Sequence, residues 1–412
     1  MKLSYSKIFS ILSVLISIAY SEYAMSQTIT DIRFIGLTRT KYSYLRDHII
    51  KTKIGDKLDS VQLKKDVQEI YNLRHFSSVD FIVLRTPDTN FVEIRYVVLE
   101  TFSMFPVLDI GLTKDFFKIQ AGAVDFNSFG RSGNTSIYVR RQGRMTYLFN
   151  GDYPYLFKGK HGLSADINKV GTYEPIYFQG FKNEYSYDLY TLLFLHRYDF
   201  NLHAFTKIGF GYQFETFRPH VYTQLSNEYP FKASAKRWMF RANYKYTKIN
   251  LNRINQNGYS IDISYNAIQS DARKNILFGS SKKLLADLRY YTNLNEFTNL
   301  AIRIRAGIGK SALFDQYVLD DNTNIRGIGF KRFRIDNEFV INIETRQIIY
   351  RHKQGILQAV LFNDYTFGHN FIGGGLRAYL EQIHGVVLRC DYGMDVKNFS
   401  KGGIVAGIHQ YF

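Results

Sequence analysis

One short stretch of the chain places an arginine between residues that favour a tight turn. It reads Asn324-Ile325-Arg326-Gly327-Ile328-Gly329-Phe330, and its two glycines permit backbone bends that other residues resist. A guanidinium can bind a carboxylate through two parallel hydrogen bonds, which a lysine cannot reproduce. Arg326 therefore suits a loop that an acidic partner must hold in one pose.

Three acidic residues that follow this stretch are candidate partners for Arg326. In an extended strand, alternate residues share a face, so each acid can be assigned to a side. Each shares its face with polar neighbours: Glu344 with Asn342 and Arg346, Asp364 with Gln358, and Asp391 with Arg389. We favour Asp364 as the partner, with Glu344 and Asp391 as alternatives. A competing interpretation is that these charges only solvate a pore.

The elements that carry these residues are strands, because the hydrophobic pattern from residue 102 onward has a period of two. Trp238, Phe240 and Tyr244 alternate with Arg237 and Arg241, and similar alternation fills about ten residues at a time. Apolar and polar faces in this arrangement are typical of strands between lipid and a wet lumen. The predicted strands are residues 106–113, 118–126, 133–141, 145–153, 160–170, 184–196, 200–216, 234–249, 257–269, 282–292, 298–309, 335–350, 354–366, 370–381, 384–394 and 402–412.

The N-terminus has the layout of a cleavable secretory signal. Lys2 and Lys7 precede an apolar run from Ile8 to Ala19, and Ala24-Met25-Ser26 forms a small-residue cleavage site. The run is shorter than the roughly 20 residues of a membrane-spanning helix. We therefore predict a signal over residues 1–26, and domains over 27–101 and 102–412.

The composition and the motifs of the sequence limit which binding partners and which reactions are expected. The formal net charge is +17 and Cys390 is the only cysteine, so no intramolecular disulfide forms. The basic residues alternate with apolar ones instead of clustering, which argues against nucleic acid and favours anionic lipid or a charged lumen. The sequence has no Gly-x-Ser-x-Gly elbow, no zinc-type spacing and no glycine-rich phosphate loop. We predict no enzyme activity, no metal and no cofactor.

The segment from Thr28 to Glu100 follows a different pattern, namely strand, helix, helix, strand, strand. Asp59 or Ser60 can cap its second helix. With Gly36 after the first strand and the run YNLRHFSSV from Tyr71, the segment resembles a single polypeptide-transport-associated (POTRA) domain. His75 has no metal-like companion, and we interpret it as a surface or capping histidine.

The predicted use of this domain is β-augmentation, in which an extended client chain pairs with a sheet edge through its backbone. The strand from Phe76 to Arg85 is the candidate edge, with Phe76, Val79, Phe81 and Val83 as its client-binding residues. The alternative is that the domain only braces the mouth of the second domain.

The chain as a whole resembles the outer-membrane-protein-85 superfamily of BamA- and TamA-like proteins, in a short form with one POTRA domain. Besides the Arg326 stretch, the resemblance rests on four motifs: Gly130-Arg131-Ser132-Gly133-Asn134, Asp152-Tyr153-Pro154-Tyr155-Leu156-Phe157, Phe362-Asn363-Asp364 with Gly368, and Leu388-Arg389 with Asp391 and Gly393. It implies an all-β transmembrane barrel of about sixteen antiparallel strands behind one small α/β domain. In this family the loop, here 310–334, folds into the lumen, where its arginine grips acidic residues. Ile328 stands where the family has an aromatic residue, and Phe330 follows two places on.

The resemblance and an even strand count set the expected sidedness. The POTRA domain and the turn Pro154–Phe157 then lie in the periplasm of a bacterial cell. The loops 173–182, 219–230 and 310–334 lie at the opposite end. The barrel itself lies in the outer membrane.

The first and last strands form a predicted weak seam. Pro106 lacks a backbone donor, the first strand begins after it, and Gly402, Gly403 and Gly407 lower the stability of the last strand. The last strand places Ile404, Ala406, Ile408 and Phe412 on one face. In the family such a seam opens laterally to template a client strand.

The function implied by the resemblance is assembly, insertion or translocation of proteins at the outer membrane. Its expected partners are unfolded outer-membrane or secreted client proteins, outer-membrane lipid and periplasmic or lipoprotein accessory factors. The alternatives are a dedicated secretion pore of the two-partner type and a passive channel that has lost assembly activity.

Overall fold

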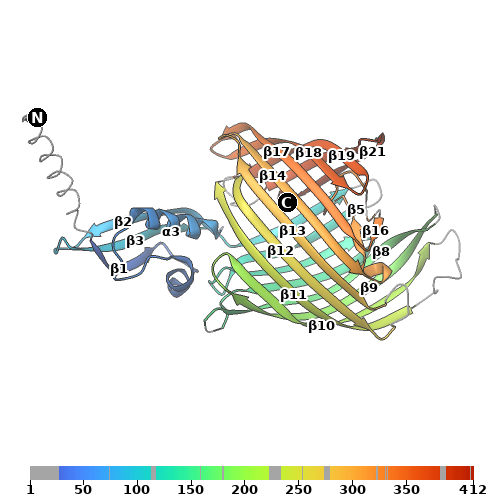
Figure 1. Cartoon of the computed structure of the whole chain (residues 1–412), viewed down its shortest axis with the longest axis horizontal. Helices are drawn as coiled ribbons and strands as arrows, with labels where there is room; N and C mark the ends of the chain where they lie inside the picture. Colours follow the sequence, from blue (N-terminus) through green and yellow to red (C-terminus); the bar gives the residue numbers. More distant parts are fainter. Residues whose placement is uncertain are drawn as a thin grey trace, which may run out of the picture.

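A computed structural model of the chain shows a small α/β domain attached to one end of a barrel (Figure 1). The structure describes residues 27–73, 75–112, 117–157, 159–178, 181–221, 233–252, 254–272, 279–321, 323–329, 331, 333–380, 387–408 and 410–412. The predicted signal over 1–26 and the predicted site residue Phe330 lie outside these residues.

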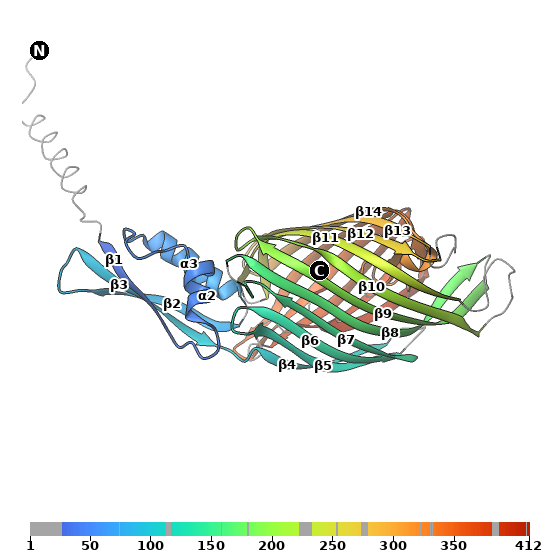
Figure 2. The ribbon, with the colours of Figure 1, turned by 90° about the horizontal axis from the view of Figure 1, so that it is seen from below.

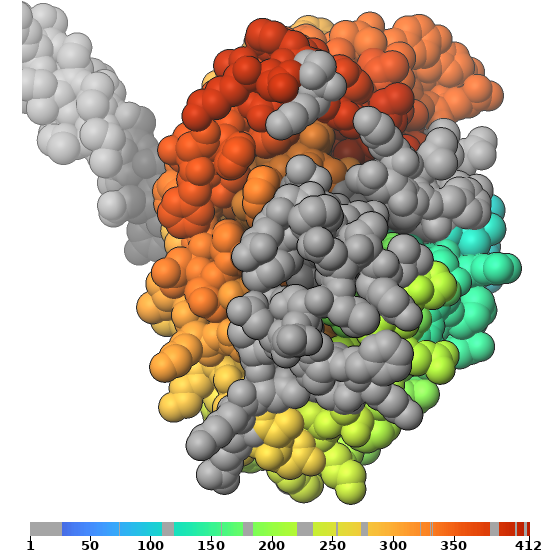
Figure 3. Space-filling view, turned by 90° about the vertical axis from the view of Figure 1, so that its right-hand side faces the viewer, coloured from blue at the N-terminus to red at the C-terminus, as the bar shows by residue number. Residues whose placement is uncertain are grey.

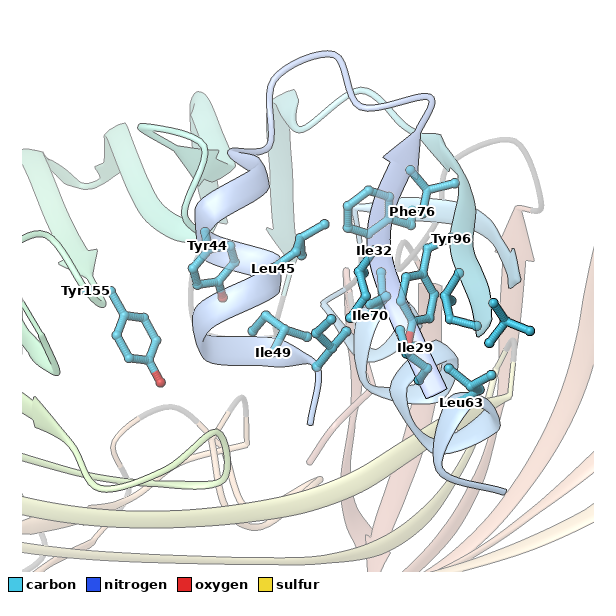
Figure 4. Packing of buried hydrophobic residues seen from close by; sticks show 14 residues of the cluster. Ile29, Ile32, Tyr44, Leu45, Ile49, Leu63, Ile70, Phe76, Tyr96 and Tyr155 are labelled. Atoms are coloured by element: carbon cyan, nitrogen blue, oxygen red, sulfur yellow. The ribbon is translucent and has the colours of Figure 1, made fainter. Parts of the chain in front are cut away.

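The N-terminal domain has a three-stranded sheet covered by helices. Its elements are β1 (Thr28–Ile35), α2 (Tyr42–Tyr44), the π-helix η1 (Leu45–Ile49), α3 (Ser60–Asn72), β2 (Phe76–Arg85) and β3 (Phe91–Glu100). The strand order is β1-β3-β2, with β1 parallel and β2 antiparallel to β3. Asp59 caps α3 by accepting hydrogen bonds from the backbone N–H groups of Val61 and Gln62. Leu63 and Ile70 then point from α3 into the core (Figure 4).

The second domain is one sheet of 16 antiparallel strands in which chain neighbours are also sheet neighbours. The strands are β4 (Met104–Leu112), β5 (Phe117–Ser128), β6 (Gly133–Gln142), β7 (Arg144–Tyr153), β8 (His161–Phe178), β9 (Phe181–Asp199), β10 (Ala204–Val221), β11 (Ala233–Asn252), β12 (Asn255–Ser270), β13 (Ser281–Asn293), β14 (Thr298–Lys310), β17 (Glu338–His352), β18 (Gly355–Thr366), β19 (His369–Leu380), β20 (Val387–Asp395) and β21 (Asn398–Ile408). The predicted all-β barrel behind an α/β domain is confirmed.

Several predicted boundaries were wrong. The expected loop over 173–182 is mostly a hairpin, because β8 and β9 continue pairing from Tyr173 and Ser186 out to Phe178 and Phe181. Strand β10 passes through Pro219, where a shift in register accommodates the missing donor. Strand β4 begins before Pro106, and β17 begins at Glu338 because Phe333–Ile335 forms β16 and pairs with β15 (Tyr317–Leu319).

Alternation along the strands separates two faces, as the sequence indicates. Trp238 is 67% exposed and its neighbour Arg237 is 0% exposed. Similarly, Leu361 lies outside while Phe362 is buried inside. The outer face therefore carries large apolar side chains and the inner face carries charged ones. Among the described residues, no helix is long and apolar enough to span a membrane.

The two ends of the sheet, β4 and β21, are neighbours in space. Seen from the end opposite the N-terminal domain, the chain runs round the rim in sequence order, from cyan through green and orange to red (Figure 3). Over the described residues, however, no backbone pairing joins β4 to β21, whereas every other neighbouring pair is bonded. We call this boundary the seam.

The expected course of the last strand was wrong beyond Ile408. Residues 410–412 are not in the sheet, and Tyr411 and Phe412 are buried against Tyr291 and Ala301 on the inner wall. The end of the chain lies within the barrel outline in two perpendicular views (Figures 1 and 2). Phe412 is therefore a luminal residue instead of a member of the outward face.

Candidate functional site: the loop lock and the seam

The long loop after β14 lies inside the barrel, as the resemblance implies. A short 3-10 helix, η2 (Leu313–Asp315), and the β15–β16 hairpin give it internal structure. Ile325 and Ile328 pack with Leu319 against Val340 and Phe371, so Ile328 fills an apolar contact at the tip. Burial of these side chains favours the folded-in pose.

Arg326 is fully buried at the loop tip and meets all three predicted acids. Its Nε and Nη2 donate to the two oxygens of Asp364, each at 2.9 Å, and Nη1 donates to Glu344 at 2.5 Å. The nearest oxygen of Asp391 lies 3.6 Å from Nη1. We call this group of four residues the loop lock. Asp364 makes the bidentate contact, and the other two candidates complete the site instead of competing with it.

The planar guanidinium of Arg326 is also enclosed by two aromatic rings. Its carbon lies 3.5 Å from the ring centre of Phe362 and 4.3 Å from that of Tyr411. Stacking of this kind is worth most where water is excluded, and both acids in hydrogen-bond contact are 0% exposed. Phe362 was expected only as part of a motif, and Tyr411 was not among the predicted site residues, because the face of a strand does not reveal which side chains meet across the lumen.

Glycines bring the loop tip against the barrel wall. Gly327 has φ of +89°, and a Cβ built on it would lie 2.4 Å from the carbonyl oxygen of Gly393. A Cβ on Gly393 would lie 2.4 Å from the carbonyl oxygen of Arg326. The Gly327 Cα is also the nearest atom to a Cβ built on Gly403. Because these glycines have no side chains, the backbone of the loop tip can lie directly against the backbone of the barrel wall.

Around the loop lock, buried charges alternate in sign. Arg346 Nε donates to Glu344 at 2.6 Å, and Arg377 Nη1 donates to Asp391 at 2.5 Å. All four of these side chains are fully buried. A buried charge needs such compensation, since an unpaired one is strongly destabilising. Arg377 was not among the predicted site residues, although alternation along its strand places it on the luminal face.

Two further ion-pair groups hold the segments of the same loop that precede and follow its tip. Arg237, fully buried, bridges Glu215 on β10 and Asp315 in η2. Glu174 on β8 accepts from Lys331 and from Arg334. Alternation in the sequence puts Arg237 on the polar face of its strand, but it does not indicate these partners. The loop is therefore held from several sides of the lumen.

The predicted seam residues lie on both sides of the boundary or beside the loop lock. Pro106 is in β4, while Gly402, Gly403 and Gly407 pair with Met394, Gly393 and Arg389 of β20. Phe412 lies away from the seam, in the lumen. Of these three glycines, Gly403 faces the loop tip, while the positions of Gly402 and Gly407 adjoin residues of β20.

The predicted client-binding strand β2 is an edge of the N-terminal sheet, but its named side chains point elsewhere. Phe76 is 0% exposed, and Val79, Phe81 and Val83 pack against the domain core. The backbone edge of β2 is available for pairing, and the exposed side chains of this strand include Ile82, at 48%. His75 is 1% exposed, so of its two interpretations, as a surface or as a capping histidine, the first was wrong. Burial lowers the pKa of His75 to about 4.

The N-terminal domain is joined to the barrel through Glu100. Its carboxylate accepts from the backbone N–H groups of Thr38, Arg39 and Thr40, and from the Asn127 side chain of β5 at 3.0 Å. Burial raises the pKa of Glu100, but these hydrogen bonds outweigh it and lower the pKa to about 2. Arg39 also pairs with Asp125 at 2.6 Å.

The motifs around Gly130 and Tyr155 belong to this same junction. The backbone N–H of Lys41 donates to the Gly130 carbonyl at 2.9 Å. Tyr155, from the β7–β8 turn, lies beside Tyr44 of the N-terminal domain (Figure 4) and stacks on His48 with ring centres 4.0 Å apart. The turn Pro154–Phe157 is therefore at the same end of the barrel as the N-terminal domain.

Helix α3 makes a second contact with the barrel. Asn72 accepts from the backbone N–H of Leu251 at 3.2 Å, and Glu69 lies 3.3 Å from His203. Within the described part of the chain, no group of three or more His, Cys, Asp and Glu side chains is arranged to hold a metal ion.

Comparison with known proteins agrees with this architecture. Residues 27–101 match the POTRA family, described as a surface antigen variable number repeat. A search of curated proteins by sequence found no significant match.

Solved structures share the fold of nearly the whole chain. BamA from Haemophilus ducreyi lacking POTRA domains 1–3 matches with a TM-score of 0.53 and 13% identity, covering 93% of this chain and 83% of that one. CdiB from Escherichia coli matches with a TM-score of 0.64 and 13% identity, covering 93% and 76%. CdiB from Acinetobacter baumannii gives 0.57 and 13%, covering 93% and 74%. The chain thus consists of one POTRA domain and a 16-stranded barrel, and it shares the fold of BamA and CdiB.

Proposed function

We propose that this protein is a non-enzymatic factor of the bacterial outer membrane that inserts or translocates other proteins, with its POTRA domain in the periplasm. Unfolded client chains are its substrates, and outer-membrane lipid and periplasmic or lipoprotein accessory factors are its further partners. It uses no nucleotide and no cofactor. The energy comes from the folding of the client itself.

The observation that carries the proposal is the seam between β4 and β21. Both strands are ends of the sheet, and no described residue of one is paired with the other. A strand edge offers free N–H and C=O groups to an incoming chain. In lipid each unsatisfied backbone group costs several kcal/mol, so a client strand that pairs at the seam is strongly favoured over an unpaired one.

The lumen supports lateral insertion over passage through the barrel. The loop that carries Arg326 occupies it and is anchored at three ion-pair groups, centred on Arg326, Arg237 and Glu174. A client that left through the seam need not displace all of them. The second candidate, a dedicated secretion pore, is favoured by the charged inner wall, which suits a polar chain in transit once the loop has moved.

The test is the rate at which unfolded outer-membrane proteins insert into liposomes that contain this protein. Cysteine pairs scanned along β4 and β21, on a Cys390→Ser background, provide a seam that can be closed by a disulfide and reopened by reductant. We expect acceleration over empty liposomes, loss of it when the seam is crosslinked, and recovery on reduction. Full acceleration with the seam crosslinked would exclude lateral opening.

A second variant separates reception of the client from insertion. Deletion of residues 28–100 removes the β2 edge and should abolish binding of unfolded clients while the barrel still enters the membrane. If client binding survives the deletion, the POTRA domain does not receive the client and only supports the mouth of the barrel. Client protein that crosses the membrane, instead of entering it, would favour the secretion pore.

A further inference from the structure

The segment that follows β21 makes specific contacts inside the lumen. We call residues 410–412 the tail segment. Both aromatic side chains of the tail are more than nine-tenths buried, with Tyr411 8% and Phe412 6% exposed. They lie in one cluster with Tyr291 of β13 and Ala301 of β14, so the chain turns from the last strand toward the middle of the barrel sheet.

Tyr411 is part of the environment of the loop lock. Its ring faces the Arg326 guanidinium at 4.3 Å and the Arg389 guanidinium at 4.9 Å. Its hydroxyl donates to the carbonyl oxygen of Asp321, in the same loop, at 3.2 Å. The wall holds Arg326 through three acids and one ring, and the tail supplies the opposite ring.

The residues on either side of Tyr411 bind other buried arginines. Arg346 Nη2 donates to the Phe412 carbonyl at 3.2 Å, and its guanidinium lies 5.6 Å from the Phe412 ring. Arg377 Nε donates to the Gln410 side chain at 3.1 Å. Because Arg346 and Arg377 also bind Glu344 and Asp391, all three tail residues contact the charge network around Arg326.

We propose that the inner wall and the loop together form a binding site for the tail segment, and that the bound tail holds the barrel closed. The tail is continuous with β21, which forms one side of the seam, and it contacts the loop that fills the lumen. Movement of β21 away from β4, or of the loop out of the lumen, therefore requires the tail to leave its site first. The proposal rests on the proposed function only in assigning a purpose to this opening.

The test uses the full-length protein in planar lipid bilayers, and measures the fraction of time spent in conducting states without any client. Tyr411→Ala removes the ring over Arg326 and should raise this fraction about tenfold, the effect of losing a desolvated cation–π contact. Tyr411→Phe keeps the ring and loses only the hydroxyl contact to Asp321, so its increase should be smaller. Tyr392→Ala, on the exposed face of β20, is the matched control and should behave as the unaltered protein.

A disulfide between the tail segment and the inner wall distinguishes release of the tail from a general perturbation of the barrel by Tyr411→Ala. Ala301→Cys and Phe412→Cys, on a Cys390→Ser background, should form a disulfide that suppresses opening, and reductant should restore it. The proposal is overturned if Tyr411→Ala matches Tyr392→Ala, if the tethered barrel opens as often as the reduced one, or if two reactive cysteines do not crosslink. Because no client is present, tail-dependent gating together with failed client insertion would retain this inference and reject the insertion function.

Discussion

Arg326 and Asp364 form a two-pronged ion pair in which Nε and Nη2 donate to separate carboxylate oxygens, each at 2.9 Å. The backbone N–H of Arg326 also donates to this carboxylate at 3.0 Å. One wall residue therefore fixes both the side chain and the main chain of the loop tip. This geometry makes the loop lock sensitive to the shape of the cation as well as to its charge.

We predict that Arg326→Lys frees the loop although it keeps the positive charge. An ammonium cannot satisfy Asp364 at two points and Glu344 at a third, so buried acids lose partners at a cost of about 3–5 kcal/mol. Hydrogen exchange of residues 317–329 should become faster in the variant. Arg351→Lys, at an exposed position near the end of β17, is the control. Equal protection of the loop in all three proteins would show that the two-pronged contact does not hold it.

The close approach of Gly327 to Gly393 predicts a difference between two glycines that share a positive φ. Gly327→Ala adds a Cβ that meets the Gly393 carbonyl at 2.4 Å, whereas Gly368, with φ of +79°, has nothing within 4 Å of its built Cβ. Gly368→Ala should therefore cost only the conformational term of about 1 kcal/mol. Gly327→Ala should also displace the loop and speed its hydrogen exchange. Similar loop exchange in both variants would contradict the contact.

The role of Glu100 as a fastener predicts that Glu100→Gln loosens the POTRA domain on the barrel. The change weakens several hydrogen bonds to a charged acceptor, by about 2 kcal/mol in total. Spin labels at the exposed positions Ile54 and Leu294, on a Cys390→Ser background, should report a broader distance distribution. Glu93→Gln, which affects a partly buried contact to Arg95 of 3.5 Å away from the junction, is the matched control. An unchanged distribution in Glu100→Gln would mean that other contacts dominate the junction.

Buried His75 predicts that the POTRA domain loses stability in mild acid. Its pKa falls from an ordinary 6.5 to about 4 on folding, so the unfolded state binds the proton first as the pH drops. The contribution is fully present above pH 6.5 and declines between pH 6.5 and 4, by roughly 3 kcal/mol. Glu100, whose pKa is lowered from 4.5 to about 2, adds a further loss below pH 4.5.

The measurement for His75 is hydrogen exchange of residues 76–100 in the full-length protein between pH 7 and 5, corrected for the intrinsic pH dependence of exchange. His75→Leu should remove most of the change in opening free energy across this range. A pH dependence that persists unchanged in His75→Leu would assign it to another group.

The strands and their two faces were predictable from the sequence because lipid and lumen demand opposite polarity of neighbouring residues. That alternation placed Glu344, Asp364 and Asp391 on one wall, and all three meet Arg326. The same alternation did not show that Phe76, Val79, Phe81 and Val83 face the core of the N-terminal domain. An edge strand in a half-covered sheet also has an inward face, and client binding at the backbone edge of β2 stays a prediction.

The order of the strands, the side of the wall on which each residue lies, and the loop that carries an arginine all follow from local patterns in the chain. Which residues meet across the lumen does not follow from them, since the height of a side chain depends on strand register and on closure of the sheet. Arg377, Tyr411 and the departure of residues 410–412 from the last strand belong to this second group. Their physical reason is the buried charge network around Arg326, which draws the tail segment inward, and no local pattern in the chain records it.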